Sequence, residues 1–258
     1  MIFDTHAHYL DERFDEDRDE LINSLVENNV VNVTEVSADR TDFTRVMEII
    51  DKYDMFYGSL GVHPGGVNRL TEEDVQFMIT NSAHKKIVAI GEIGLDYHNM
   101  ENYPTKEEQD EWFVRQMDIA REVKLPIIVH SRDAAKDTID LMVEHGAKDL
   151  GGVIHCYSYS AEMAKSFLDL GYYIGIDGPI TFKNGRKNRE VVEYVPLDRL
   201  VIETDSPYLT PDPFRGQRNN STYLKYVVEK IAEIKNVSSE EVERVTYENA
   251  LKLYRIQK

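Results

Sequence analysis

Short apolar runs rich in β-branched residues alternate with segments of helical periodicity along the whole chain. The run Val-Val-Asn-Val-Thr-Glu-Val at 30–36 is typical of a strand in a buried parallel sheet. By contrast, Phe113, Met117 and Ala120 recur at intervals of three or four residues, as on one face of a helix. The pattern predicts eight strands, over residues 1–3, 30–36, 55–62, 87–93, 126–129, 152–154, 172–176 and 200–202.

Helical patterns fill the segments between these strands. The first predicted helix carries an apolar set at helical spacing, namely Phe14, Leu21, Ile22, Leu25 and Val26. Two helices finish the chain, and the last opens with a capping box from Ser238 to Glu241. Eight strands, each followed by a helix and with no linker or repeat break, predict an α/β fold, a single-domain (β/α)8 TIM barrel over residues 1–258. A doubly wound open sheet is the alternative, and the eight regular units favour the closed barrel.

Composition fits a soluble globular protein with a large core, since 41% of the 258 residues are hydrophobic and 30% are charged. The net charge of −17 argues against a surface that coats nucleic acid generally, but not against a metal site that grips phosphates locally. The single cysteine, Cys156, excludes an internal disulfide and is expected to be a small buried apolar residue. We find no secretion signal, no membrane span and no sign of an obligate protein partner, and we expect a cytoplasmic protein.

Ligand-type side chains come after most of the predicted strands, at the end where TIM barrels carry their active sites. A histidine at one strand end is more often a hydrogen-bonded loop residue, and two histidines at an HxH spacing are ambiguous alone. Packing does not need a whole set of such groups, and burying them unpaired is costly. The sequence therefore predicts a metal site. Its candidates lie at the strand ends, namely His6 and His8 at strand one, His63 at strand three, Glu92, His130 and His155 at strands four to six, and Glu203 to Asp205 at strand eight.

Four histidines and two carboxylates exceed what one tetrahedral ion with an open position needs. They suit two divalent ions bridged by a carboxylate and a water, and Glu92 lies between the two halves of the set along the chain. Mixed imidazole and carboxylate ligands favour Zn or Mn over Mg without fixing the metal. Asp205 is expected to bind one ion and to act as general base, so Glu92 and Asp205 are the predicted catalytic residues.

The other histidines serve as comparisons. His84 lies in a polar segment at a helix end, and His145 lies at a helix C-terminus, where a cationic ring suits the dipole. Both are expected to be structural or exposed. His98 comes after the fourth strand in a loop at the active face and is expected near the substrate.

With these residues in place, the sequence resembles the TatD family of metal-dependent deoxyribonucleases, among the amidohydrolase-type barrels. The resemblance implies that the metal ligands are His6, His8, Glu92, His130, His155 and Asp205. One departure is that Asn219 is followed by Asn220-Ser221, where the family usually has Glu-Pro, and this bears on substrate preference. The motifs span the chain at 4–8, 61–64, 91–97, 130–134, 155–158, 203–209 and 215–219.

The resemblance implies phosphodiester hydrolysis of DNA by exonuclease or endonuclease action, with single strands or ends as the expected substrate. The expected substrate contacts are His63, Tyr97, Arg132, Tyr157, Arg215 and Arg218, the tyrosines by stacking on bases and the arginines by binding phosphate. A basic loop after strand seven is expected to steer a strand towards the site, although it is equally consistent with a solvated charged loop. Its residues are Lys183, Arg186, Lys187 and Arg189.

Two other functions stay open at this point. The same metal site can activate water against a carbonyl, in amide, ester or lactone hydrolysis or in removal of aminoacyl groups from tRNA. A metal-dependent binding module without catalysis is the third hypothesis, and six ligands around open coordination positions disfavour it.

Overall fold

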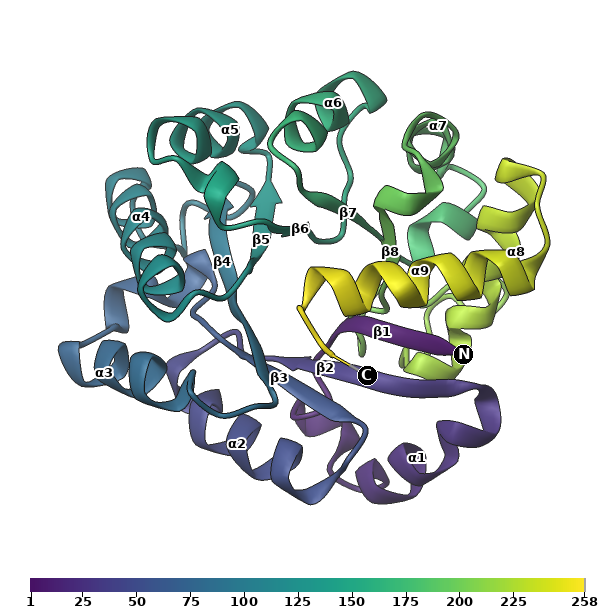
Figure 1. The fold of residues 1–258 in the computed structure, drawn as a ribbon, viewed down its shortest axis with the longest axis horizontal. Helices are drawn as coiled ribbons and strands as arrows, with labels where there is room; N and C mark the ends of the chain where they lie inside the picture. Colours follow the sequence, from purple (N-terminus) through teal and green to yellow (C-terminus); the bar gives the residue numbers. More distant parts are fainter. Residues whose placement is uncertain (258) are drawn as a thin grey trace.

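Eight parallel strands succeed one another around a barrel in sequence order, and helices surround them (Figure 1). The computed structural model describes residues 1–257. Ala7 at the end of the first strand pairs with Ser206, just beyond the last, so the sheet closes on itself. The predicted barrel is therefore confirmed over the open doubly wound sheet. The strands are β1 (Ile2–Ala7), β2 (Val30–Val36), β3 (Phe56–Leu60), β4 (Ile87–Asp96), β5 (Ile127–Arg132), β6 (Gly152–Ile154), β7 (Tyr173–Ile176) and β8 (Leu200–Ile202).

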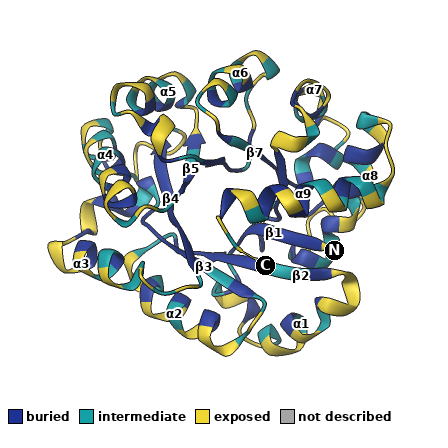
Figure 2. Cartoon of the chain, in the orientation of Figure 1, coloured by how far each residue is buried: buried dark blue, intermediate teal, exposed yellow. Residues whose placement is uncertain are grey.

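The helices form the outer layer, with their apolar faces turned inwards (Figure 2). None of those in residues 1–257 is long and apolar enough to cross a membrane. The α-helices are α1 (Arg18–Ser24), α2 (Phe43–Lys52), α3 (Glu72–Asn81), α4 (Lys106–Val123), α5 (Ala135–Glu144), α6 (Ala161–Asp169), α7 (Arg186–Tyr194), α8 (Leu224–Lys235) and α9 (Ser239–Leu253). Short 3-10 turns are η1 (Glu12–Phe14), η2 (Val26–Asn28), η3 (Arg40–Asp42), η4 (Pro64–Arg69), η5 (Ala147–Asp149), η6 (Gly178–Thr181), η7 (Leu197–Arg199) and η8 (Ser221–Tyr223).

One end of the barrel is closed by aromatic side chains. The ring of Phe3, early in β1, contacts Tyr247 and Tyr254 of the C-terminal segment at centroid distances of 6.3 and 5.9 Å. The buried Tyr254 hydroxyl donates to the carbonyl of Thr5 at 2.6 Å. Because all eight strands are parallel, the polar side chains that follow them lie at the opposite, carboxyl end, which these rings leave open.

Three strands are longer than the sequence predicts. β1 continues to Ala7 and so includes His6. β4 continues to Asp96 and β5 to Arg132, because Gly94 and the two residues after it pair with residues 130–132. A side chain at Gly94 would come within 1.9 Å of the His130 carbonyl, and its φ of +145° also favours glycine. His130 therefore lies within β5 rather than after it, and Asp96 lies within β4.

The first helix also differs from the prediction. α1 ends at Ser24, the chain tightens into η2, and Asn29 with a φ of +65° turns it into β2. Val26 lies on the outside of this turn and is 61% exposed, so its assignment to the core face was wrong. At α9 the Ser238 side chain accepts from the Glu241 amide, but Glu241 itself pairs with Arg244, so only half of the predicted capping box forms.

Candidate metal centre

A cavity of about 640 Å³ opens at the carboxyl ends of the strands. It receives side chains from nearly every strand end, which is where the sequence places the ligand candidates. Five of the six predicted ligands line it, and the sixth, His6, is fully buried behind them. The charged, imidazole and thiol groups of its wall are His8, His63, Glu92, Asp96, His130, Arg132, His155, Cys156, Asp177 and Asp205.

His6, His8 and Asp205 form one group of potential ligands. The Nε2 atoms of the two histidines lie 3.1 Å apart, and Asp205 Oδ1 is 3.7 Å from the first and 3.4 Å from the second. Nδ1 of His8 donates to the Val36 carbonyl at 2.8 Å, which fixes the ring so that Nε2 faces the group. Two ring nitrogens and a carboxylate directed at one another fit a divalent cation.

Glu92 lies between this group and a second one. Its Oε1 is 2.6 Å from His130 Nδ1 and 2.7 Å from His155 Nε2. Its Oε2 faces the other way, 3.6 Å from His6 Nε2 and 3.9 Å from His8 Nε2. One oxygen of this buried carboxylate thus faces His130 and His155, and the other faces His6 and His8.

Asp96 joins the site although the sequence did not single it out. Its Oδ2 is 3.1 Å from His130 Nε2 and 3.9 Å from His63 Nε2. Since strand four was predicted to end at Ile93, Asp96 was assigned to the loop beyond it. The missed indication was its alternation with Glu92, because residues two and four apart share a strand face.

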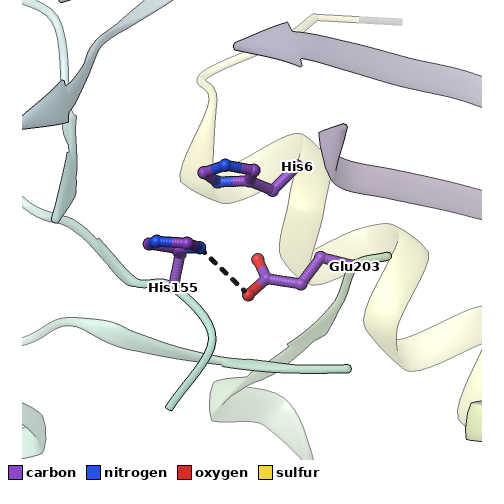
Figure 3. A group of neighbouring side chains, drawn as sticks. All are labelled: His6, His155 and Glu203. Atoms are coloured by element: carbon purple, nitrogen blue, oxygen red, sulfur yellow. Dashed lines mark ion pairs between the residues drawn. The ribbon is translucent and has the colours of Figure 1, made fainter. Parts of the chain in front are cut away.

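Glu203 was a candidate at the end of strand eight but not one of the six predicted ligands, and it lies close to His6 and His155 (Figure 3). The rings of His6 and His155 stack at a centroid distance of 4.0 Å, and Glu203 Oε1 is 3.9 Å from His155 Nδ1. The same oxygen accepts from the Cys156 amide. Nδ1 of both histidines is buried without a hydrogen-bond partner among the described residues. Buried polar atoms normally have a partner, and a cation bound in this group would supply one.

The pKa values of the clustered histidines differ, because some rings contact carboxylates and others lie beside a second histidine. Burial lowers the pKa of His8, but contact with Asp205 and the charge of Glu92 outweigh it and raise the pKa to about 10. The pKa of His130 rises to about 9 against burial, through Asp96 and Glu92. Burial and the neighbouring His155 lower the pKa of His6 to about 4. Without a bound metal ion, the rings of His8 and His130 are therefore doubly protonated and cationic at neutral pH.

Metal binding is accordingly expected to release protons. Neutral pH lies below the pKa values of about 10 and about 9, so a cation must displace protons from His8 and His130 to bind them. Metal affinity should rise with pH, by about tenfold per unit for each proton displaced, until the pH passes those values. Titration calorimetry in buffers of different ionisation enthalpy measures this release directly. A heat that does not depend on the buffer would contradict the assignment of protons to these rings.

Of the predicted substrate contacts, His63 and Arg132 line the cavity. Tyr103 and Tyr208, which the sequence did not single out, line it as well. Tyr103 meets the His63 ring edge-on at 5.9 Å, and Tyr208 is 49% exposed with the Arg13 guanidinium 4.2 Å above it. These two tyrosines are the aromatic faces available at the mouth.

The predicted stacking role of Tyr157 is wrong. Its ring is 1% exposed, packs against Tyr159 and Phe167, and donates its hydroxyl to the Ser160 carbonyl. Tyr97 does not line the cavity either, since its hydroxyl donates to Asp137. Both tyrosines lie close to the active face in sequence, but their rings turn into the protein and towards α5.

Arg215 and Arg218 also lie outside the cavity wall. Arg218 makes two hydrogen bonds to the Asp17 carboxylate, so its predicted phosphate contact conflicts with an existing ion pair. Arg215 lies 4.1 Å above the Phe182 ring, at the surface. The predicted basic loop is mostly helix, because Arg186, Lys187 and Arg189 lie in α7 and only Lys183 precedes it. Arg186 pairs with Glu190 and Arg189 donates to three backbone carbonyls, whereas Lys183 and Lys187 have no ion pair among the described residues.

Three further residues differ from their expected places. Cys156 is only partly buried and lines the cavity, rather than filling the core as predicted. His98 is exposed, pairs with Asp133 and lies outside the cavity wall. Asn220 caps η8 by accepting from the Thr222 amide, so the Asn-Ser departure belongs to a helix start rather than to the cavity wall.

Comparison with known proteins gives the same family as the sequence motifs. Residues 3–255 match the family model described as TatD related DNase. The Bacillus subtilis protein YabD, named an uncharacterized metal-dependent hydrolase, is 47% identical over 99% of this chain and 100% of its own length.

Solved structures agree. The TatD homologue YJJV from Escherichia coli superposes with a TM-score of 0.91 at 27% identity, over 99% of this chain and 98% of its own. An uncharacterized amidohydrolase from Saccharomyces cerevisiae shares the fold, with a TM-score of 0.86 at 19% identity, over 98% of this chain and 99% of its own.

Proposed function

Since the chain belongs to the TatD-related DNase family of metal-dependent hydrolases, we propose that it hydrolyses phosphodiester bonds of DNA at a centre of two divalent cations. The observation that carries the proposal is the position of Glu92, whose two oxygens face separate groups of ligands. His6, His8 and Asp205 would hold one ion and His130 and His155 the other, with Glu92 between them. Zn, Mn and Mg all remain compatible with this mixed donor set.

The charge of the cavity explains why cations are needed. Of the described residues lining it, Arg132 is the only arginine or lysine, and Glu92, Asp96, Asp177 and Asp205 contribute carboxyl groups. The protonated rings of His8 and His130 offset part of this negative charge, but metal binding would displace those protons, so the cations themselves would have to attract the phosphodiester. When bound, divalent cations neutralise phosphoryl charge and make a bound water more acidic.

Asp205 is suited to accept the proton of the attacking water. Burial raises its pKa, but His8, His6 and His155 outweigh burial and lower it, so the carboxylate is ionised at neutral pH. Arg132 would hold a non-bridging phosphate oxygen, and Tyr103 and Tyr208 would flank the adjoining bases or sugars.

A carbonyl substrate is the second candidate, and the acidic wall supports it. The ionised Asp96 carboxylate favours a neutral or cationic group more than a second phosphate. A panel of amides, esters, lactones and aminoacyl-tRNA separates the two functions, because carbonyl turnover far above nuclease turnover would replace the DNA proposal.

The proposal is tested with the full chain loaded with Mg, Mn or Zn and with end-labelled single- and double-stranded DNA. We expect degradation by the wild type and its loss in Asp205→Asn, which keeps the side-chain shape but removes the proton acceptor. Metal content is measured on both proteins. Equal DNA hydrolysis by this variant at equal metal content would refute the role of Asp205, and no hydrolysis by the fully loaded wild type would refute the function.

A further inference from the structure

Aromatic and basic side chains form a strip beside the metal cavity. They come from the loops after β7 and β8 and from the start of α8, next to α7 in Figure 1. The strip consists of the half-buried rings of Phe182, Phe214, Tyr223 and Tyr226, together with the exposed side chains of Lys183, Arg215 and Lys225.

The strip continues directly from the cavity rim. Pro179 and Leu209 line the cavity, and Phe182 and Arg215 lie further along the same two loops. The loops touch there, because a side chain at Gly178 would come within 1.8 Å of the Leu209 carbonyl oxygen. The Asp212 amide also donates to Thr181 Oγ1 at 2.9 Å. A strand leaving the cavity across the surface of these two loops would run onto the strip.

The rings of the strip are arranged by stacking. Phe214 and Tyr223 stack at a centroid distance of 4.7 Å and an interplanar angle of 11°, and Tyr226 lies 5.5 Å from Phe214. Arg215 stacks on Phe182, and the Lys225 ammonium is 5.2 Å from the Tyr226 ring. Flat rings and guanidinium planes beside cations are the surface on which nucleic-acid bases stack.

The cationic groups of the strip are not neutralised by ion pairs, although the chain has a net charge of −17. Lys183, Arg215 and Lys225 have no ion-pair partner within 4 Å among residues 1–257, unlike neighbouring Arg186, which Glu190 pairs. Asp212 is the acidic residue of the same loop and does not pair with them. A polyanion would meet most of the protein surface unfavourably and this strip favourably.

We propose that the strip binds single-stranded nucleic acid and holds the part of the strand that extends out of the cavity. The inference rests on the proposed function, because it assigns the strand path of the same site. Cations bind successive phosphates, and the rings stack on unpaired bases, which a duplex does not offer.

The test compares two charge-matched double variants, Lys183→Glu/Lys225→Glu in the strip and Lys85→Glu/Lys148→Glu as control. The control lysines are exposed and precede β4 and β6, on the opposite face of the barrel, so both variants lower the net charge equally. Binding of a labelled single strand of about 12 nucleotides is measured by fluorescence anisotropy in chelator, where hydrolysis does not occur.

We expect the strip variant to raise the Kd roughly tenfold or more at low salt and the control by about twofold at most. Equal effects of the two variants, tighter binding of duplex than of single strand, or no binding by the wild type would each overturn the inference. Tight binding of an RNA strand as well would support it, since the recognised chemistry is the same. Far-ultraviolet circular dichroism confirms that both variants fold.

Failure of this inference is distinct from failure of the proposed function. A wild type that binds the strand in chelator but never hydrolyses DNA when loaded would refute the nuclease and leave the strip standing. A protein that hydrolyses DNA, but whose strand binding the strip variant does not weaken, would refute the strip alone.

Discussion

Glu92→Gln is expected to lower kcat/KM for hydrolysis by roughly a thousandfold, because several kcal/mol of transition-state stabilisation depend on the metal centre. The amide keeps the shape of the side chain but removes the charge that both ligand groups share. In the wild type, the two carboxylate oxygens of Glu92 lie within 3.6 Å of ring nitrogens of His130, His155 and His6. Initial rates and metal content are measured on the same preparation.

The control for this variant is Glu144→Gln, an exposed carboxylate at the end of α5 that changes net charge equally. It should retain wild-type rates and metal content. Wild-type hydrolysis by Glu92→Gln with both ions still bound would show that the shared carboxylate is dispensable.

Much of the fold and the centre of the site could be predicted from sequence, because both depend on local periodicity. Strands such as Val30–Val36 are recognisable by composition, and in a closed parallel barrel the residues after the strands gather at one end. The HxH spacing of His6 and His8 places both rings on one side of β1, and the structure brings their Nε2 atoms to 3.1 Å. Neither inference needed knowledge of distant contacts.

Details of the site that depend on pairing between strands could not be predicted in this way. Asp96 joins the cluster only because Gly94 lets β4 continue along β5, which is a close backbone approach between segments far apart in sequence. Glu203 was visible beside Asp205 in the sequence. Its position close to His6 and His155 depends on how the last strand meets the first across the closed sheet.

The substrate contacts were the least predictable because long side chains choose partners by tertiary geometry. Arg218 looks like a phosphate-binding residue by sequence, but it reaches Asp17, 201 positions away. Tyr157 is beside two cavity residues in the chain, yet its ring turns into the core against Phe167. A position near a strand end therefore predicts where a short metal-ligating side chain lies better than it predicts the contacts of a long side chain.

The double variant His6→Ala/His8→Ala is expected to lose one of two bound ions while the barrel stays folded. Both rings belong to the group with Asp205, and the second group retains His130 and His155. Bound metal per chain should fall from about two to about one. The matched control, His84→Ala/His145→Ala, removes histidines beside Asp51 and at the end of α5 and should leave metal content unchanged. Full occupancy in the first variant, with a native circular dichroism spectrum, would show that His6 and His8 are not ligands.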